Sequence, residues 1–173
     1  MQLYHVNRHW KNHPINPQKF NEIAGFLCDK FSTSIHIPRT DKSGWLKANL
    51  IALGNHDSTD NYQGKFLDRL DQLIGSNNDW IFGHLGYNLQ EETDGAATEF
   101  PNEDGFSDGF FFVPEVVIFL EDQTLQIGGV TEAQTRKIIE LLDKTIIADP
   151  IMEEVTLSVR TSRDVYLNNC RQL

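Results

Sequence analysis

Cysteine, basic side chains and long apolar runs are all scarce in this sequence. The 173 residues include two cysteines, Cys28 and Cys170, which are far apart and follow no metal-ligand spacing, so we expect two reduced thiols. Fifteen Lys and Arg stand against 25 Asp and Glu, and the formal net charge of −10 argues against a surface that binds nucleic acid or an anionic membrane. No apolar run approaches the roughly 20 residues needed to cross a bilayer. The first residues, MQLYHVNRHW, lack the apolar core of a signal peptide, so we expect a cytoplasmic protein.

Apolar and aromatic residues are present in the proportion of a folded domain. The chain is 39% apolar and 23% charged, which argues against disorder. Eleven Phe and three Trp supply bulky core material, and 173 residues can bury one substantial core. We therefore expect one main globular domain, with two small domains as the weaker alternative.

The predicted helices follow from apolar spacing and from capping residues. A helix over residues 17–31 is expected to begin at the capping Asn16, with Pro17 at its first position. A second helix carries the apolar residues of 62–73 and is expected to end at the cap Gly75. Two more helices are predicted, one after the capping box of Thr131 and Gln134 and one from residue 161 to the end of the sequence.

The predicted strands are short apolar runs bounded by turn residues. They are expected near residues 3–6, 34–37, 48–53, 79–85, 110–120, 124–128 and 155–159, with 110–120 forming either one long strand or two strands broken at Pro114. Residues 121–123 are expected to turn the chain into a hairpin. Because helices are interleaved with hairpin-joined strands, the fold class is α+β, with a mostly antiparallel sheet and interleaved helices.

The stretch WIFGHLGYNL, residues 80–89, contains two glycines and a tyrosine where a strand is expected to end. Glycine permits a positive φ and a close approach of two backbones. We interpret Gly83 and Gly86 as residues that let a buried strand pass close to its neighbour and turn into a short helix. Tyr87 is expected to hold that corner by packing its ring and bonding its hydroxyl. These three residues form a structural motif, not a reactive one.

The residues alone point to no reactive centre. His5, His9 and His13 are spaced by four, but Pro14 follows and no Cys or carboxylate completes a ligand set, so we expect no metal site. Residues 91–108 hold seven carboxylates without the order of a calcium loop, which indicates a solvated loop. Neither a nucleophile elbow nor a phosphate-binding loop is present.

Three segments in collinear order resemble the N-terminal region of the chorismate-utilising enzymes. They are DWIFGHLGYNL (79–89), FFFVPEVVIFLEDQTLQI (110–127) and SRDVYLNNCRQL (162–173). The family includes anthranilate synthase component I, aminodeoxychorismate synthase component I and the isochorismate synthases. The aromatic run before Pro114 is most similar to the aminodeoxychorismate synthase component I branch. The resemblance covers about residues 20–173.

The resemblance implies the N-terminal portion of an anthranilate-synthase component I-like fold. Residues 1–160 would form the N-terminal domain, and residues 161–173 the first helix of a chorismate-binding catalytic domain that lies further along. The whole enzyme would be a transferase that makes 4-amino-4-deoxychorismate from chorismate and ammonia. The Mg²⁺ ion and all catalytic residues would lie in the catalytic half. The implied partners are that half and a glutamine amidotransferase subunit.

The sequence departs from the family where anthranilate synthases carry a Ser-bearing, tryptophan-binding motif. By order, that motif falls on the strand 34–37 and the residues after it, where this chain has Ile37, Pro38 and Arg39. Arg39 could pair with a ligand carboxylate in bidentate fashion or could be an exposed loop residue. Three functions therefore stay open: aminodeoxychorismate synthesis, anthranilate or isochorismate synthesis within the same family, and a free-standing small-molecule-binding regulatory module.

Overall fold

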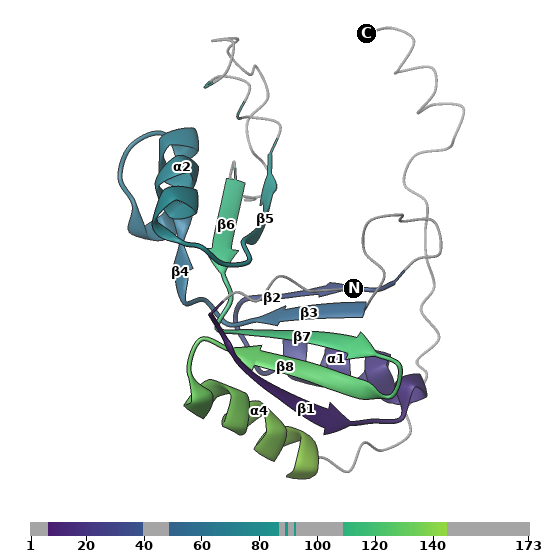
Figure 1. Cartoon of the computed structure of the whole chain (residues 1–173). Helices are drawn as coiled ribbons and strands as arrows, with labels where there is room; N and C mark the ends of the chain where they lie inside the picture. The colour runs from purple at the N-terminus through teal and green to yellow at the C-terminus, as the bar shows by residue number, and fades with distance from the viewer. Residues whose placement is uncertain (1–6, 40–48, 87–88, 90–91, 93–108, 145–173) are drawn as a thin grey trace, which may run out of the picture.

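The structure is a computed structural model, and it describes residues 7–39, 49–86, 89, 92 and 109–144. The chain is an α+β protein built on two β-sheets (Figure 1). Every strand pairing within these residues is antiparallel, as the sequence predicts. Among the described helices, none combines the length and the apolar character needed to cross a membrane.

The larger sheet has five strands. Their order across the sheet is β1 (His9–Pro14), β8 (Thr124–Gly129), β7 (Val116–Glu121), β3 (Asn49–Leu53) and β2 (Ser34–Ile37). Strands β7 and β8 form the predicted hairpin, which closes at the Glu121–Thr124 pair. The turn residue Asp122 has a φ of 54°, a left-handed conformation that Asp tolerates better than most residues.

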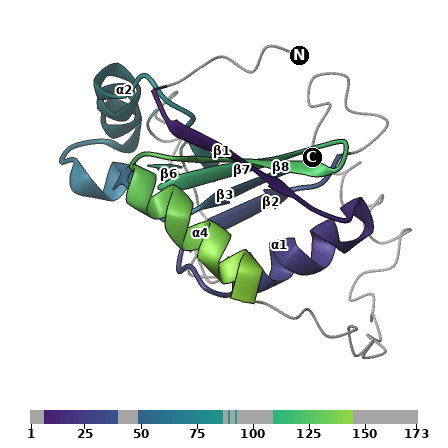
Figure 2. The same cartoon turned by 60° about the horizontal axis from the view of Figure 1, so that its bottom comes forward.

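Two helices cover one face of this sheet (Figure 2). Helix α1 (Phe20–Cys28) follows the short 3₁₀ helix η1 (Pro17–Lys19), whose N-terminus the Asn16 side chain caps as predicted. Helix α4 (Glu132–Lys144) begins at the predicted capping box, where Thr131 and Gln134 bond each other's backbone N–H groups. The core between this face and the helices contains Phe20, Ile23, Ala24, Leu27, Ile51, Leu53, Val116, Ile118, Leu120, Leu125, Ile127 and Ile138.

The opposite face of the five-stranded sheet is also apolar. Strands β3 and β7 are buried along almost their whole length because their alternate side chains enter two different cores. Ile51 and Ile118 face the helices, whereas Leu50 and Phe119 face the second sheet. This explains why both strands appear as continuous apolar runs in the sequence.

The second sheet has three strands, in the order β4 (Asp57–Ser58), β6 (Gly109–Val113) and β5 (Phe82–Leu85). It rises from one end of the larger sheet, and α2 (Phe66–Ser76) lies beside it (Figure 1). The short 3₁₀ helix η2 (Thr59–Asn61) leads from β4 towards α2.

The sequence left open whether residues 110–120 form one strand or two, and the structure shows two. The chain changes sheets at Pro114, between β6 and β7.

Several local predictions are wrong. The second helix begins at Phe66, so Tyr62 lies outside it, and strand β1 was not predicted. Gly75 does not cap the second helix, because α2 continues to Ser76 and the Asn77 side chain donates to the Leu73 carbonyl oxygen at 2.9 Å. Strand β5 is not buried: it is an edge strand, and residues 83–85 are exposed. Tyr87, the expected strand at 3–6 and everything predicted beyond residue 144 lie outside the described residues.

Candidate functional site

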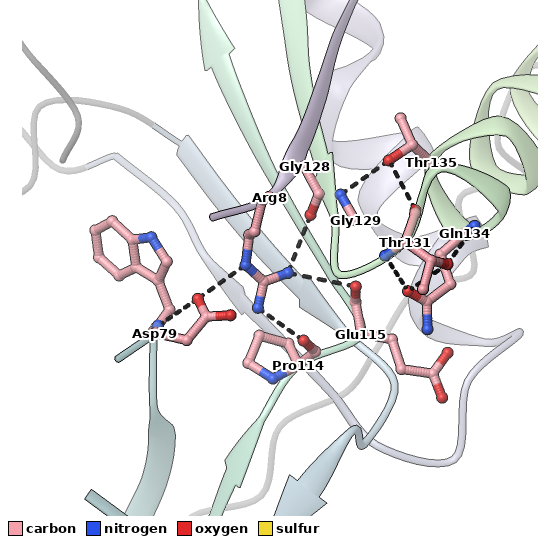
Figure 3. A network of polar contacts seen from close by, with 10 residues as sticks. Arg8, Asp79, Pro114, Glu115, Gly128, Gly129, Thr131, Gln134 and Thr135 are labelled. Atoms are coloured by element: carbon pink, nitrogen blue, oxygen red, sulfur yellow. Dashed lines mark hydrogen bonds and ion pairs between the residues drawn. The ribbon is translucent and has the colours of Figure 1, made fainter. Parts of the chain in front are cut away.

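The junction of the two sheets is organised by one buried arginine (Figure 3). Arg8 precedes β1, and its side chain is completely buried. Its Nε donates to Asp79 Oδ1 at 2.8 Å, and Nη2 donates to the Pro114 carbonyl oxygen at 2.8 Å. Nη1 donates to the carbonyl oxygens of Gly128 at 3.0 Å and Glu115 at 3.3 Å. The guanidinium therefore joins the start of β1, the end of β8, the segment before β5 and the point where the chain changes sheets.

A row of aromatic rings fills the space between the sheets. Phe119 of β7 lies between two indoles, with ring centroids 6.1 Å from Trp10 and 5.6 Å from Trp80. Trp80 stacks on Phe82 at 6.2 Å, and Phe82 lies 6.2 Å from Phe112. Trp10, Trp80 and Phe82 are only partly buried, so the row borders on solvent.

A cleft of 520 Å³ opens where the free edge of β2 faces the second sheet. It is lined by Ser32, Thr33, Ser34, Ile35, Gly83, His84, Phe110 and Phe112. Four of these residues precede or begin β2, and the other four belong to β5 and β6. The wall therefore combines three hydroxyl groups and one imidazole with two aromatic rings.

Gly83 has the close contact predicted for it. It pairs with Phe111 across β5 and β6. A Cβ atom at position 83 would lie 2.6 Å from Phe111 Cγ, and it would also collide with the Phe110 carbonyl oxygen. Glycine is required here because two backbones meet without room for a side chain. Gly86 follows β5 directly, and its carbonyl oxygen accepts from the Leu89 N–H at 3.4 Å.

The predicted ligand residues lie away from the cleft. Ile37 is half-buried at the last position of β2, and Pro38 and Arg39 are exposed just beyond it. The Arg39 backbone N–H donates to Asn49 Oδ1 at 2.7 Å, which closes the end of the β2–β3 pair. The cleft lies at the opposite end of β2, so the structure does not bring these three residues together with the cleft-lining groups.

The histidine series does not converge with other metal ligands in the described part of the chain. His9 and His13 lie on β1, and His5 is outside the described residues. His13 Nδ1 is 4.0 Å from Asp143 Oδ1 on α4. Within residues 7–39, 49–86, 89, 92 and 109–144, no three His, Cys, Asp or Glu side chains are grouped as metal ligands. None of these residues is therefore assigned to the Mg²⁺ that the family resemblance implies.

One residue of the acidic segment 91–108 has a defined role. Glu92 accepts from the backbone N–H groups of Phe66 at 2.8 Å and Leu67 at 3.0 Å. These are the first two residues of α2, whose N–H groups have no partner inside the helix. The two backbone hydrogen bonds lower the pKa of Glu92, and the positive charges of Lys65 and Arg69 add to the effect. The carboxylate thus serves as a distant helix cap.

No family model matches this sequence, and no curated protein matches it. The family resemblance therefore rests on the three quoted segments alone. Two of them, 79–89 and 110–127, contribute strands β5, β6, β7 and β8 to the described structure.

Sequence reasoning missed Arg8 and most of the cleft. A single arginine before a strand carries no local signal, because its partner Asp79 is 71 residues away. The cleft-lining Ser32, Thr33 and Ser34 appear in the sequence as an ordinary polar turn. The exposure of β5 was not predicted because the apolar run Trp80-Ile81-Phe82 is typical of a buried strand.

Proposed function

We propose that this chain is the non-catalytic N-terminal part of an aminodeoxychorismate synthase component I. The whole enzyme would convert chorismate and ammonia to 4-amino-4-deoxychorismate for 4-aminobenzoate and folate synthesis. A glutamine amidotransferase subunit would supply the ammonia. The chorismate-binding half would hold the Mg²⁺ and all catalytic groups, and the region described here would complete the fold around it.

The observation that carries the proposal is the pairing of β5 with β6. These strands come from two of the three segments whose sequences resemble the family, and they pair from Phe82–Phe112 to Leu85–Gly109. The glycine of the first segment is packed against the aromatic run of the second. Residues of two of the three resembling segments thus form one structural unit, which supports a shared fold more strongly than separate motifs do.

The incompletely covered face of the larger sheet gives further support. Six residues that pack on its outer core are only partly buried: Trp10, Ile35, Ile37, Trp80, Phe82 and Phe110. At the free edge of β5, Leu85 is 59% exposed. Apolar surface grouped in this way is typical of a site where another protein domain docks.

An activity assay with separate polypeptides tests the proposal. The coding sequence after codon 173 is read first, and we expect it to continue in frame into a chorismate-binding domain. The 173-residue chain, given chorismate, ammonium and Mg²⁺, should form no product. Adding the catalytic domain as a second polypeptide should produce aminodeoxychorismate at a rate above that of the catalytic domain alone. Turnover by the 173-residue chain alone would refute this division of roles.

A matched pair of surface variants sharpens the assay. Leu85→Asp places a charge on the exposed apolar edge of β5 and should reduce the stimulation of the catalytic domain. Ile74→Asp places the same charge on α2, where Ile74 is 54% exposed, and should leave the stimulation unchanged. Equal stimulation by both variants would exclude the β5 edge as the docking surface.

The rival functions are separated by product and by binding. An anthranilate or isochorismate synthase would release a different product in the same two-polypeptide assay. A free-standing small-molecule-binding module is favoured by the cleft between the sheets. Calorimetric titration of the chain with tryptophan, chorismate and 4-aminobenzoate addresses that function. Tight binding favours the module, and absence of binding favours the dependent half-enzyme.

A further inference from the structure

We propose that the cleft between the two sheets binds a flat aromatic small molecule that carries no net charge. The site is formed by residues 32–35 of the larger sheet and by β5 and β6 of the smaller one. The site depends on its lining residues alone, whether or not the chain is part of a chorismate-utilising enzyme.

The cleft provides an aromatic wall. The rings of Phe110 and Phe112 are stacked, with centroids 5.7 Å apart and planes inclined by 21°. Both side chains belong to the face of β6 that looks towards the larger sheet, and Ile35 adds an aliphatic surface. Aromatic ligands gain from offset or edge-on contacts with such rings. The volume of 520 Å³ lies within the ~300–1,000 Å³ range of small-molecule sites.

The cleft also provides a polar rim. Ser32, Thr33 and Ser34 follow one another into β2 at the cleft wall, and Ser32 is exposed. A hydroxyl group can both donate and accept a hydrogen bond, so it suits a ligand hydroxyl, amide or ring nitrogen. The imidazole of His84 lies on the β5 side of the cleft, opposite this rim. A ligand with one hydrogen-bonding substituent on an aromatic ring matches the arrangement.

The described lining residues favour an uncharged ligand. Among the eight of them, none is Lys, Arg, Asp or Glu. Arg39, the cation at the end of β2, lies beyond the opposite end of that strand. A charged group that enters the cleft would lose hydration without gaining a counter-charge, which is unfavourable. An uncharged ligand avoids this cost.

Three compounds of one ring skeleton test the inference, with NMR spectra of the ¹⁵N-labelled full chain as the readout. 2-Naphthol is neutral and aromatic, 2-naphthoate is aromatic and charged, and decahydro-2-naphthol is neutral and saturated. We expect 2-naphthol to cause saturable shifts of the residue 32–35, Gly83 and His84 amides, with an affinity at least about tenfold above that of either comparator. Equal affinities for the three compounds, or shifts only elsewhere, would overturn the proposal.

Variants locate the binding in the cleft. Ser32→Trp fills the exposed mouth without removing core atoms and should weaken 2-naphthol binding by about tenfold or more. The control Glu140→Trp adds the same side chain to an exposed position of α4 and should leave the affinity unchanged. Full affinity in Ser32→Trp with a native-like spectrum would exclude the cleft.

A second variant covers the case in which Ser32→Trp fails to fold. Phe110 is only partly buried, so Phe110→Leu removes one ring of the aromatic wall and keeps much of its volume. We expect the 2-naphthol affinity to fall several-fold while the chain stays folded, as its amide spectrum would report. An unchanged affinity in this variant would show that the aromatic wall does not bind the ligand.

Discussion

The guanidinium of Arg8 and the carboxylate of Asp79 form an ion pair of 2.8 Å at the junction of the two sheets. Arg8 precedes the first strand of the larger sheet, and Asp79 precedes β5 of the smaller sheet. The same carboxylate oxygen accepts from the Trp80 backbone N–H at 2.6 Å. The pair thus fixes how the segment leading into β5 approaches the larger sheet, and with it one wall of the cleft.

Removing one partner of this pair should be strongly destabilising. Asp79→Ala leaves the fully buried Arg8 charge without its counter-ion, so we expect the free energy of unfolding to fall by about 3 kcal/mol. The double variant Arg8→Met/Asp79→Ala should lose less than the sum of the single losses, because no buried charge stays unpaired. Urea unfolding followed by circular dichroism measures the loss of unfolding free energy in the two single variants, Asp79→Ala and Arg8→Met, and in the double variant. Asp71→Ala, at an exposed position of α2, is the control and should change little. Strict additivity would show that Arg8 and Asp79 are not coupled.

Gly83 should not tolerate a methyl group. The added Cβ atom of Gly83→Ala would collide with the Phe110 carbonyl oxygen and lie 2.7 Å from Phe111 Cα, both of which belong to the backbone of β6. Since backbone atoms cannot rotate away, β5 must separate from β6. We expect a loss of a few kcal/mol in unfolding free energy, together with lost protection of the β5 and β6 amides in hydrogen exchange.

Gly75→Ala is the matched control for this substitution. Gly75 lies inside α2, and an added Cβ there meets nothing within 4 Å. Alanine is favoured over glycine in a helix, so this variant should gain up to about 1 kcal/mol near the end of the helix. A neutral effect at both positions would contradict the close approach of the two backbones at Gly83.

Local signals in the sequence were sufficient for several elements of the larger sheet, but not for its edge strand β1 (His9–Pro14), which no strand prediction covered. The hairpin β7–β8, the strand 34–37 and the capping box of Thr131 and Gln134 all follow from residues next to one another in the chain. Turn and cap geometry depends on a few neighbouring residues, so it can be inferred without knowing the fold.

The division of residues 110–120 between two sheets and the exposure of β5 depend on pairing between residues far apart in the sequence. Pro114 indicated a break, but only the pairing of Phe112 with Phe82 and of Val117 with Ala52 assigns the two halves to different sheets. The exposure of β5 follows from its place at a sheet edge, which no local pattern reports. The cleft is missed for the same reason, because its two walls come from segments about 50–80 positions apart in the chain.

Thr135 should be required for its hydroxyl group rather than for its shape. Its Oγ1 donates to the His9 carbonyl oxygen at 2.7 Å and accepts from the Gly129 N–H at 2.9 Å, and the residue is fully buried. Thr135→Val keeps the volume but leaves those two backbone groups without this partner, which should cost about 1–3 kcal/mol. Thr135→Ser keeps the hydroxyl and should recover most of the lost stability. If the serine variant is the less stable of the two by thermal unfolding, packing dominates at this position.

Ionised Asp57 should contribute to the free energy of unfolding at neutral pH, and this contribution should be lost in acid. Desolvation acts to raise the pKa of Asp57, but hydrogen bonds from Asn77, Asn61, the Ser58 N–H and Tyr62 outweigh it and hold the pKa below its usual value of 3.8. A carboxyl group whose pKa is lowered by folding stabilises the native state above its unfolded pKa. That contribution is lost as the pH falls through the lower, folded-state pKa.

Urea titrations of the wild type and of Asp57→Asn between pH 6 and pH 2 measure the free energy of unfolding at each pH and should reveal this contribution. The variant cannot ionise at this position, so its stability should fall less steeply than that of the wild type below about pH 4. Asp60→Asn, at an exposed position three residues along, is the matched control and should follow the wild-type slope. A wild-type slope in Asp57→Asn would mean that the four hydrogen bonds do not favour the ionised form, and that Asp57 holds β4 to the end of α2 through its geometry alone.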